Sequence, residues 1–366
     1  MSASGTTRIL VLTPGIGGTD GVSEVTRQYV SALVRRPGLP GDSLEIWSLS
    51  DDGRPAWLPP EVGFRTAGRS RLAFASFALR ATEVDEDTLV LVMHVHLLAV
   101  VLPLTGRGAR LVAVLYGIEA WKPLRRLERA GLRKAGRIAA ISQCTIDGFR
   151  RANPDLAGLS IDVCPPGVPP AAVAAGPVTP GPFALIVGRM ASAERYKGHD
   201  ALIELWPRVC EAVPDAKLLV VGTGDDAARL REKADRLGLS GRVVFAGRVA
   251  GEVLASLYRD ADFFVMPSAG EGFGLVYLEA MRAGKPCIAS HGAAEEVVDD
   301  GVDGLIVDGG DREALEAAIV RLFVDRDLRG RLGAAATEKV RTRFSAERFE
   351  RCVRDTLGLG EVPLAC

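Results

Sequence analysis

Residues 262–290 have the sequence DFFVMPSAGEGFGLVYLEAMRAGKPCIAS, which contains an apolar run, a glycine-rich loop, a helical pattern and a second apolar run. The first run ends near Met266, and the helical pattern begins near Leu275 and stops at Gly284 and Pro286. Glycine and proline at these places are typical of a helix C-terminus. A strand, a helix and another strand in this order predict one β-α-β unit of a parallel sheet.

The same alternation of short apolar runs and helical patterns continues in both directions along the chain. The runs are continuously apolar, which is the pattern of parallel strands covered on both faces. The sequence therefore predicts an α/β protein made of two Rossmann-like, doubly wound parallel sheets, each with its ligand crevice at the carboxyl ends of its strands. The other expected strands are RILVLTP (8–14), LEIWSL (44–49), TLVLVMH (88–94), ARLVAVLYG (109–117), RIAAIS (137–142), FALIVGR (183–189), AKLLVVGTG (216–224), RVVFAGRV (242–249) and GLIVD (304–308).

The length of the chain and a proline-rich segment predict two domains. A single hydrophobic core rarely grows beyond about 250–300 residues, and the chain has 366. Seven prolines and three glycines within 163–183 indicate a linker. We therefore expect an N-terminal domain over 1–172 and a C-terminal domain over 182–344. A last helix within about 345–366 is expected to pack back on the N-terminal domain.

Charge and cysteine content exclude several classes of protein. The 45 basic and 46 acidic side chains give a net charge of −1, so no chain-wide positive field attracts nucleic acid. Six cysteines without a CxxC pair and only four histidines predict neither a bound metal nor a disulfide framework. The first residues lack a signal-peptide pattern, and the longest apolar stretch, 88–104, is too short and too interrupted to span a membrane. These features predict a cytoplasmic protein.

A first glycine-rich loop follows the expected strand 8–14. It includes Gly15, Gly17 and Gly18, and a helical pattern begins near Ser23. Backbone N–H groups at such a helix start suit a phosphate or a sugar hydroxyl. The G-x-G-x-x-x-G spacing departs from a dinucleotide-binding fingerprint, because Asp20 stands where the third glycine is needed. Dinucleotide binding, a tight connection, and another anion or sugar contact all remain open for this loop.

The glycine-rich loop within 262–290 carries a more specific signal. Gly272 and Gly274 allow a ligand to approach backbone N–H groups at the helix start, which favours an anion. Glu271 precedes the helix and Glu279 lies on it, about two turns away. Carboxylates accept hydrogen bonds only, so the pair suits the hydroxyls of a sugar. The alternative is a helix-capping role for Glu271 and a solvent-exposed position for Glu279.

Two cations follow the expected strand 183–189. Arg189 is its last residue, and Lys197 comes eight residues later in the segment YKGHD. Arginine offers a planar fork to phosphate oxygens and lysine a point charge, so the two can neutralise a diphosphate without Mg²⁺. The alternative is an ordinary solvated surface. Their place at the same crevice edge as the 267–286 loop and helix favours the phosphate site.

Three motifs together resemble the group 1 (family 4) glycosyltransferases, which have the two-domain GT-B fold with a central cleft. They are the Glu271 to Glu279 spacing with GFGL between, GRM with YKGHD, and residues 291–311. The resemblance implies a retaining, nucleotide-sugar-dependent enzyme whose acceptor binds the N-terminal domain. It also assigns roles: Arg189 and Lys197 to the diphosphate, Glu279 to the ribose, Glu271 to the donor sugar, the backbone of Gly272, Phe273, Gly274 and Leu275 to sugar or phosphate, Arg248 and Val249 to the base, and Gly17 and Gly18 to closure over the donor.

One position departs from the family pattern. Many relatives have a histidine where this chain has Tyr116, which lies three residues before Glu119. Tyrosine is a poor base near neutral pH, so we expect no histidine-type proton transfer there. His94 and His96 follow the neighbouring strand and are candidates for the acceptor site beside Tyr116 and Glu119. Simple packing is the alternative for both histidines.

The sequence thus predicts transfer of a sugar from a UDP- or GDP-sugar to a hydroxyl of a sugar, a lipid-linked molecule or a small aglycone. No cofactor or metal is expected. The alternatives are a nucleotide-sugar 2-epimerase of the same fold and a non-catalytic sugar-nucleotide-binding subunit.

Two stretches rich in arginine and apolar residues, 64–80 and 122–137, lie in the expected N-terminal domain. Such stretches can bind an anionic membrane surface, which would place the protein at the inner face of the membrane. The alternative is buried phenylalanines beside solvated arginines.

Overall fold

The computed structural model describes residues 8–18, 20–35, 43–168, 176 and 181–359. Parts of four predicted segments lie outside these residues: the N-terminal 1–7, position 19 of the first glycine loop, the linker positions 169–175 and 177–180, and the end of the C-terminal segment from 360. The described chain divides into two compact units. One comprises the residues up to Gly167 together with those from Ala346, and the other comprises Val168–Ser345.

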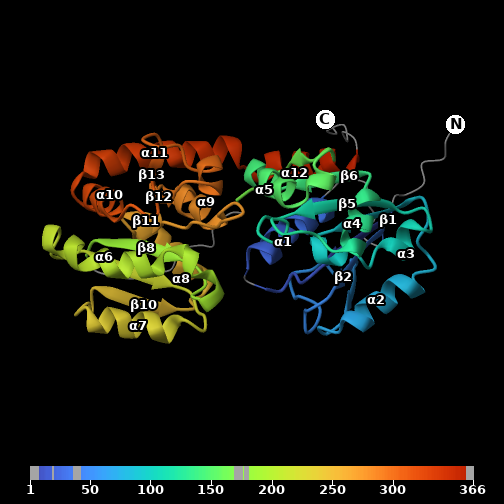
Figure 1. Cartoon of the computed structure of the whole chain (residues 1–366), viewed down its shortest axis with the longest axis horizontal. Coiled ribbons are helices and arrows are strands. Elements are labelled where there is room, and N and C mark those ends of the chain that lie inside the picture. The colour runs from blue at the N-terminus through green and yellow to red at the C-terminus, as the bar shows by residue number, and fades with distance from the viewer. Residues whose placement is uncertain (1–7, 19, 36–42, 169–175, 177–180, 360–366) are drawn as a thin grey trace. The chain divides into compact units, whose positions relative to one another are not determined.

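The first unit is built on a seven-stranded parallel sheet in the order β3-β2-β1-β4-β5-β6-β7 (Figure 1). The order reverses between β1 and β4, and open parallel sheets bind ligands at such a reversal. Its strands are β1 (Arg8–Thr13), β2 (Leu44–Ser48), β3 (Gly63–Thr66), β4 (Thr88–Val92), β5 (Arg110–Leu115), β6 (Arg137–Ala140) and β7 (Asp162–Val163). Its helices are α1 (Gly21–Val34), α2 (Arg71–Arg80), α3 (Leu102–Thr105), α4 (Arg126–Arg133), α5 (Gln143–Ala152) and α12 (Ala346–Leu357), with 3-10 turns η2 (Val95–Leu97) and η3 (Pro154–Leu156).

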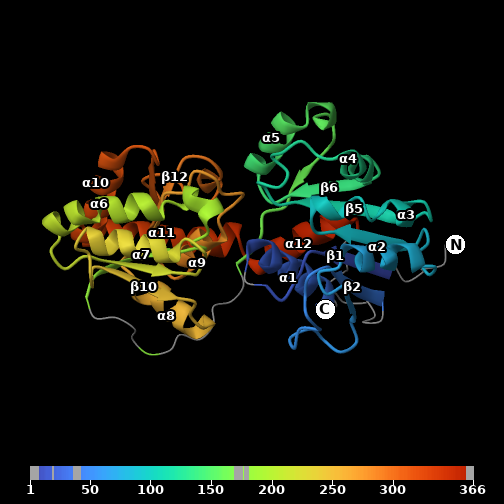
Figure 2. The same ribbon diagram turned by 60° about the horizontal axis from the view of Figure 1, so that its bottom comes forward.

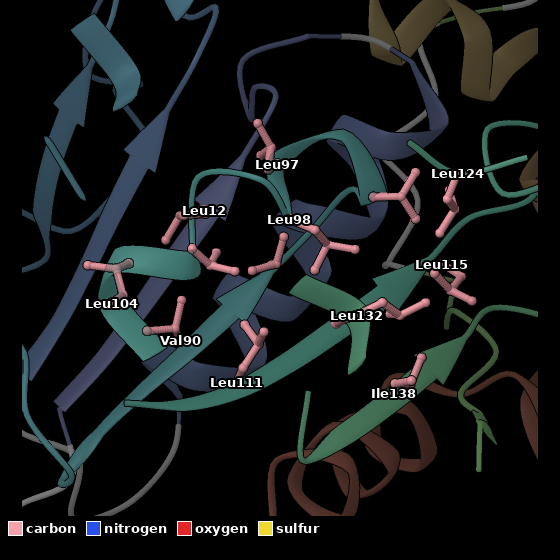
Figure 3. Packing of buried hydrophobic residues seen from close by; sticks show 14 of the residues in the cluster. Leu12, Val90, Leu97, Leu98, Leu104, Leu111, Leu115, Leu124, Leu132 and Ile138 are labelled. Carbon is pink, nitrogen blue, oxygen red and sulfur yellow. The ribbon is translucent and has the colours of Figure 1, made fainter. Parts of the chain in front are cut away.

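The core of this unit explains the continuously apolar runs. Successive side chains of a strand point to opposite faces, and in β4 both Leu91 and Val92 are fully buried. Figure 3 shows one of the two faces, where leucines of α3, α4 and η2 pack over Val90, Leu111 and Ile138 of the sheet. Both faces of the sheet are therefore covered, as the pattern predicts.

The last described helix belongs to the first unit although it follows the second in sequence. Figure 2 shows α12, in red, beside α1, in dark blue. The ring of Phe349 in α12 meets the ring of Tyr29 in α1 edge-on, with centroids 5.2 Å apart. Arg137 at the start of β6 donates a hydrogen bond of 2.6 Å to the carbonyl of Asp355. These contacts attach α12 to both α1 and β6.

The second unit contains a six-stranded parallel sheet in the order β10-β9-β8-β11-β12-β13. The predicted fold class, two Rossmann-like parallel-sheet domains, is confirmed. The order reverses between β8 and β11, and α6 packs against α7 and α10 while α9 packs against α8 and α11. The strands are β8 (Phe183–Val187), β9 (Lys217–Val221), β10 (Val243–Gly247), β11 (Phe263–Met266), β12 (Cys287–Ser290) and β13 (Gly304–Val307). The helices are α6 (His199–Ala212), α7 (Ala227–Arg236), α8 (Gly251–Asp260), α9 (Leu275–Arg282), α10 (Arg312–Val324) and α11 (Arg326–Arg343), with 3-10 turns η4 (Ser192–Lys197) and η5 (Ala293–Glu296).

No helix among the described residues is long and apolar enough to cross a membrane.

Close packing of α11 on the end of α9 requires a glycine. A Cβ atom added at Gly333 would lie 2.1 Å from the backbone oxygen of Gly284. Gly330, one turn earlier in α11, is exposed and has no atom within 4 Å of such a Cβ. The same substitution at these two positions should therefore have opposite effects.

We predict that Gly333→Ala lowers the free energy of unfolding by about 2–3 kcal/mol, because a backbone atom blocks the added methyl group. Gly330→Ala should raise it by about 0.5–1 kcal/mol, because alanine favours a helix over glycine. Thermal unfolding of the two variants and the parent measures both effects. Equal melting temperatures for the two variants would contradict the packing described here.

Candidate functional site

The segment after β8 is fixed by the strand beside it. The backbone N–H of Met190 donates to the carbonyl of Thr223 over 3.0 Å, beyond the end of β9. A Cβ atom at Gly222 would lie 1.9 Å from the carbonyl oxygen of Gly188, and Gly222 has a φ of +139°. Only glycine permits this close approach. The path of the chain through Arg189 is thereby determined.

The segments after β8 and β11 meet at the point where the strand order reverses. The backbone N–H of Ala269 donates to the carbonyl of Tyr196 over 3.0 Å. Gly198 has a φ of +88°, and a Cβ there would lie 2.6 Å from the ring of Pro267. These contacts hold the two loops, which carry the predicted clamp and the predicted glutamate, against each other.

Lys197 and Glu271 form an ion pair at this contact. Lys197 Nζ lies 2.7 Å from Glu271 Oε1, and the two side chains are only 14% and 16% exposed. The hydroxyl of Ser268 donates to the same carboxylate oxygen over 3.1 Å. Lys197 and Glu271 were predicted to lie in one site, but their pairing with each other was not predicted.

Arg189 also contacts a carboxylate. Its guanidinium pairs with Oε1 of Glu194 in η4, and Arg189 is 65% exposed whereas Glu194 is 15% exposed. Both cations of the predicted diphosphate clamp therefore face negative charge supplied by the chain itself. A phosphate at the same nitrogen atoms would compete with these carboxylates.

Glu279 is held by a tyrosine that the sequence analysis missed. Tyr258, on α8, donates its hydroxyl proton to Glu279 Oε2 over 2.7 Å. Burial raises the pKa of Tyr258 well above its ordinary range, with a further contribution from the charge of Glu279. Tyr258 thus remains a hydrogen-bond donor. Its position in an apolar helix pattern resembles that of any core aromatic, so no sequence signal marks this contact.

The start of α9 is shaped by Gly274. This residue has a φ of +89°, and a Cβ there would lie 2.5 Å from the ring of Tyr277. Tyr277 is buried and donates its hydroxyl proton to the carbonyl of Met266 over 2.6 Å. Phe273 packs its ring on Phe344 in the core, so only its backbone faces a ligand in the predicted role. Gly272 and Leu275 are half-buried on either side.

Arg248 and Val249 are the residues predicted to contact the nucleotide base. They follow β10 at the carboxyl ends of the strands, and β9 lies between β10 and β8. Arg248 is exposed and Val249 is half-buried. The structure therefore places the predicted base contact on the far side of β8 from Glu271. The predicted base, phosphate and sugar contacts thus follow β10, β8 and β11 in turn, which suits an extended ligand.

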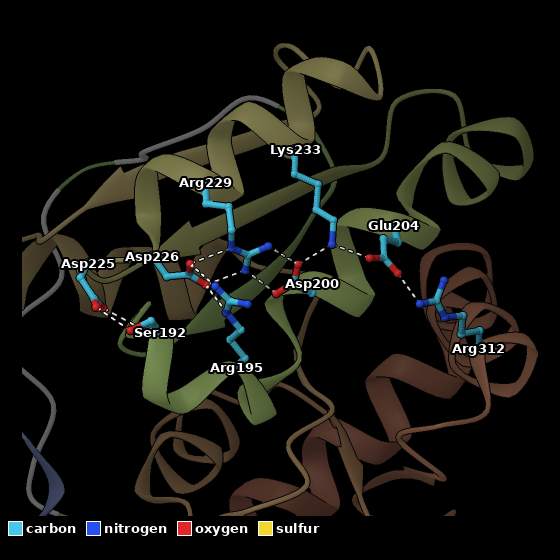
Figure 4. Close-up of polar contacts among 9 residues, drawn as sticks. All are labelled: Ser192, Arg195, Asp200, Glu204, Asp225, Asp226, Arg229, Lys233 and Arg312. Carbon is cyan, nitrogen blue, oxygen red and sulfur yellow. Dashed lines mark hydrogen bonds and ion pairs between the residues drawn. The ribbon is translucent and has the colours of Figure 1, made fainter.

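A network of ion pairs anchors η4, which connects Arg189 to Lys197 (Figure 4). Arg195 pairs with Asp226 at 3.1 Å, and the backbone N–H of Ser192 donates to Asp225 over 2.8 Å. Arg229 joins Asp226 to Asp200, and hydrogen bonds from Arg229 and Lys233 lower the pKa of Asp200 to about 2. Asp200 therefore keeps its charge at neutral pH. A cavity of about 430 Å³ lies beside this network, lined among others by Tyr196, Pro267, Ser290, Asp308 and Arg312.

In the first unit, the predicted anion cradle of the glycine loop already holds a carboxylate. The backbone N–H groups of Ile16 and Gly17 each donate to Asp51 over 2.9 Å. The helix begins at Gly21, two residues before the predicted start at Ser23, because the Asp20 carboxylate caps it by accepting from the N–H of Ser23 at 3.0 Å. A Cβ at Gly18 would lie 2.6 Å from Ser23 Oγ. The loop is a well-packed connection as well as a candidate for ligand contact.

The four acceptor-side candidates lie at the carboxyl ends of β4 and β5, which are neighbours in the sheet. His94 Nδ1 accepts from the backbone N–H of His96 over 3.2 Å, and burial lowers the pKa of His94 to about 4. Glu119 Oε1 accepts from the backbone N–H of Tyr116 over 2.7 Å. Burial raises the pKa of both Tyr116 and Glu119.

His96 is the exposed member of this group. Its Nδ1 lies 3.0 Å from Glu128 Oε1, and its side chain is 58% exposed. Tyr116 is buried, and its hydroxyl lies 3.4 Å from that of Thr26 on α1. Within the described ranges, no three or more His, Cys, Asp or Glu side chains are grouped so that they could hold a metal ion.

Comparison with known proteins agrees with these motifs. The model of the family described as "Glycosyl transferases group 1" matches residues 181–325. A GDP-mannose-dependent alpha-(1-6)-phosphatidylinositol monomannoside mannosyltransferase from Mycolicibacterium smegmatis is 32% identical over 263 residues, 65% of this chain and 68% of the relative. A protein of the same description from Mycobacterium tuberculosis is 39% identical over 152 residues, 39% of this chain and 40% of the relative. The chain thus spans well under half the length of that second relative.

Solved structures show a likeness in fold. A sucrose-phosphate synthase from Thermosynechococcus elongatus superposes with a TM-score of 0.77 at 22% identity, covering 96% of this chain and 100% of that one. The match extends across both units, and the mycobacterial likeness extends across two thirds of a curated relative. The chain therefore belongs to the group 1 glycosyltransferases.

Proposed function

We propose that this protein is a retaining glycosyltransferase that moves a sugar from a nucleotide-sugar donor to a hydroxyl acceptor. The observation that carries the proposal is the Lys197–Glu271 ion pair, 2.7 Å long and mostly buried, at the meeting point of the β8 and β11 loops. A cation and an acceptor-only carboxylate side by side suit a ligand with a phosphate next to a sugar. We propose GDP-mannose as the first donor to test, because the mycobacterial relatives are described as GDP-mannose-dependent, and UDP-glucose as the second.

The proposed chemistry needs charge stabilisation more than an enzyme nucleophile. The bond between the anomeric carbon and the diphosphate breaks, the acceptor oxygen bonds to that carbon on the same face, and the leaving phosphate takes the acceptor's proton. Arg189 and Lys197 stabilise the charge that develops on the diphosphate. Glu271, released from Lys197, then accepts from a hydroxyl of the donor sugar, and Glu279 accepts from the ribose. We propose that no metal or other cofactor takes part.

We predict that Arg189→Ala and Lys197→Ala each lower kcat/KM by about 10²-fold, because each removes a positive charge from the leaving group's site. The measurement is the rate at which the nucleoside diphosphate is released from GDP-mannose or UDP-glucose in the presence of an acceptor. Near-parental rates in both variants would refute the site.

Two further experiments test the ribose contact and the absence of metal catalysis. Glu279→Ala should raise the donor KM more than it lowers kcat, because it removes a contact to the ribose and none to the reacting atoms. EDTA should leave the parental rate unchanged.

Exchange of solvent deuterium at C2 of the nucleotide sugar, without transfer, would indicate an epimerase instead. Binding without any turnover would indicate a non-catalytic subunit.

On the acceptor side, we propose that neutral His94 and exposed His96 hydrogen-bond the acceptor. Because burial lowers the pKa of His94 to about 4 from 6.5, the folded chain resists its protonation. Its contribution to the free energy of unfolding is present above about pH 6.5 and is lost as the pH falls toward 4.

We predict an NMR titration midpoint near pH 4 for His94, and one above 6.5 for exposed His291, whose pKa is raised by its contact with Glu295. A His94→Gln variant assigns the signal. A His94 midpoint between about 6 and 7 would show that the ring is solvated like a model imidazole and would remove it as a neutral partner.

We further propose a lipid-linked acceptor reached at the inner surface of a membrane. The support is α2, where Leu72 is 85% exposed and Leu79 is 63% exposed, with Arg71 and Arg80 next to them. Phe74, in the same helix, is buried, so only part of this stretch is available to a membrane. In the second basic stretch, 122–137, Arg129 and Arg133 both pair with Asp155. These pairs reduce the positive charge that this stretch can offer to a membrane.

We predict that the chain sediments with vesicles containing phosphatidylinositol and not with phosphatidylcholine vesicles, and that high salt releases it. Leu72→Ser with Leu79→Ser should abolish sedimentation, whereas Leu237→Ser, at an apolar residue 41% exposed in the second unit, should not. Equal sedimentation of all three proteins, or none with either vesicle, would point to a soluble acceptor.

A further inference from the structure

Glu194 occupies an unusual position beside the clamp. It lies in η4, five residues after Arg189 and three before Lys197, where the backbone angles depart from the 3-10 geometry of its neighbours. One carboxylate oxygen accepts from the guanidinium of Arg189. The other, Oε2, is buried and finds no hydrogen-bond partner among the residues that the structure describes. Its side chain is 15% exposed. The chain thus keeps a poorly hydrated negative charge next to the arginine proposed to hold a diphosphate.

A carboxylate shielded from water exerts a stronger field on its surroundings than a solvated one, because the effective dielectric constant around it is lower. The neighbouring Tyr196 is affected by this field. Its pKa rises to about 12, chiefly through burial and further through the charges of Glu194 and Glu271. A phosphate bound by Arg189 would meet the same field, and it would also compete with Glu194 for the guanidinium.

The two diphosphates that bind the proposed site, the nucleotide-sugar donor and the nucleoside diphosphate product, differ in charge. In a nucleotide sugar, the β-phosphate is joined to the α-phosphate by an anhydride bond and to the sugar by an ester bond, and it carries one negative charge. In the nucleoside diphosphate left after transfer, the β-phosphate is terminal and loses a second proton near pH 6, as phosphate monoesters do. At pH 7.5 the product therefore carries about one more negative charge than the donor. That charge sits on the phosphate next to the broken bond, which the clamp holds in the proposed mechanism.

We propose that Glu194 is a specificity-determining residue that weakens binding of the nucleoside diphosphate product more than binding of the nucleotide-sugar donor. The inference rests on the donor site proposed above. Repulsion from Glu194 acts on both ligands, but it acts on about one more charge in the product. The residue would therefore favour exchange of spent product for fresh donor and limit product inhibition.

The test uses Glu194→Gln in the full chain, which removes the charge and keeps the shape. Isothermal titration at pH 7.5 measures the Kd of GDP and of GDP-mannose without acceptor, and of UDP and UDP-glucose in the same way. We expect the substitution to tighten nucleoside diphosphate binding about 4- to 10-fold and nucleotide-sugar binding only about 2- to 3-fold, because the same repulsion acts on two charges of the terminal phosphate and on one charge of the donor's β-phosphate. At pH 5.5, where the terminal phosphate is largely monoanionic, the two ligands should respond alike. A residue with a purely structural role would not give this pH dependence.

Two further variants serve as controls. Glu338→Gln removes a carboxylate from the exposed Glu338–Arg341 pair in α11 and should change neither Kd. Glu194→Asp retains the charge and should keep the parental preference, even if the loop shifts slightly.

An equal effect of Glu194→Gln on donor and product, no effect on either, or weaker product binding by a folded variant would overturn the inference and leave the proposed function standing. A parent chain that binds no nucleotide or nucleotide sugar would instead refute the proposed function, and this inference with it.

Discussion

The ion pair between Lys197 and Glu271 joins the two loops on which the whole candidate site depends. Its partners are 74 residues apart in sequence, and only the adjacency of β8 and β11 brings them together. That adjacency is the reversal point of the sheet, where the loops of neighbouring parallel strands diverge and leave room for a ligand. Gly198 and Gly222 have positive φ angles and allow backbone contacts that any side chain would block. Topology and glycine placement therefore fix the pair before any ligand arrives.

Three of the candidate anion-binding groups contact a carboxylate of the chain. Lys197 contacts Glu271, Arg189 contacts Glu194, and the N–H groups of Ile16 and Gly17 contact Asp51. Of the two cations only Lys197 is mostly buried, and a buried charge without a partner is costly. Internal carboxylates reduce that cost in the free protein. Under the proposed function a diphosphate competes with these carboxylates for the same nitrogen atoms, which offsets part of its attraction to the cations.

Elements with local sequence signals were predictable. β11 ends at Met266 and α9 begins at Leu275, as predicted, because a strand pattern, glycines and a proline mark these boundaries within a few residues. The start of α1 was wrong by two residues, because the capping carboxylate of Asp20 and not Ser23 determines it. The four acceptor-side candidates follow β4 and β5, which are neighbours in the sheet. Tyr258, Asp51 and Glu194 were missed, because their roles depend on side-chain contacts that form only after folding and no pattern in the sequence marks them.

A crystal structure of the full chain with a bound nucleoside diphosphate would show directly whether Lys197 and Arg189 exchange their carboxylate partners for phosphate oxygens. We expect Lys197 Nζ to leave Glu271 Oε1 and contact an oxygen of the diphosphate, and Arg189 to leave Glu194 in the same way. A diphosphate bound elsewhere on the chain, with both ion pairs intact, would contradict this expectation.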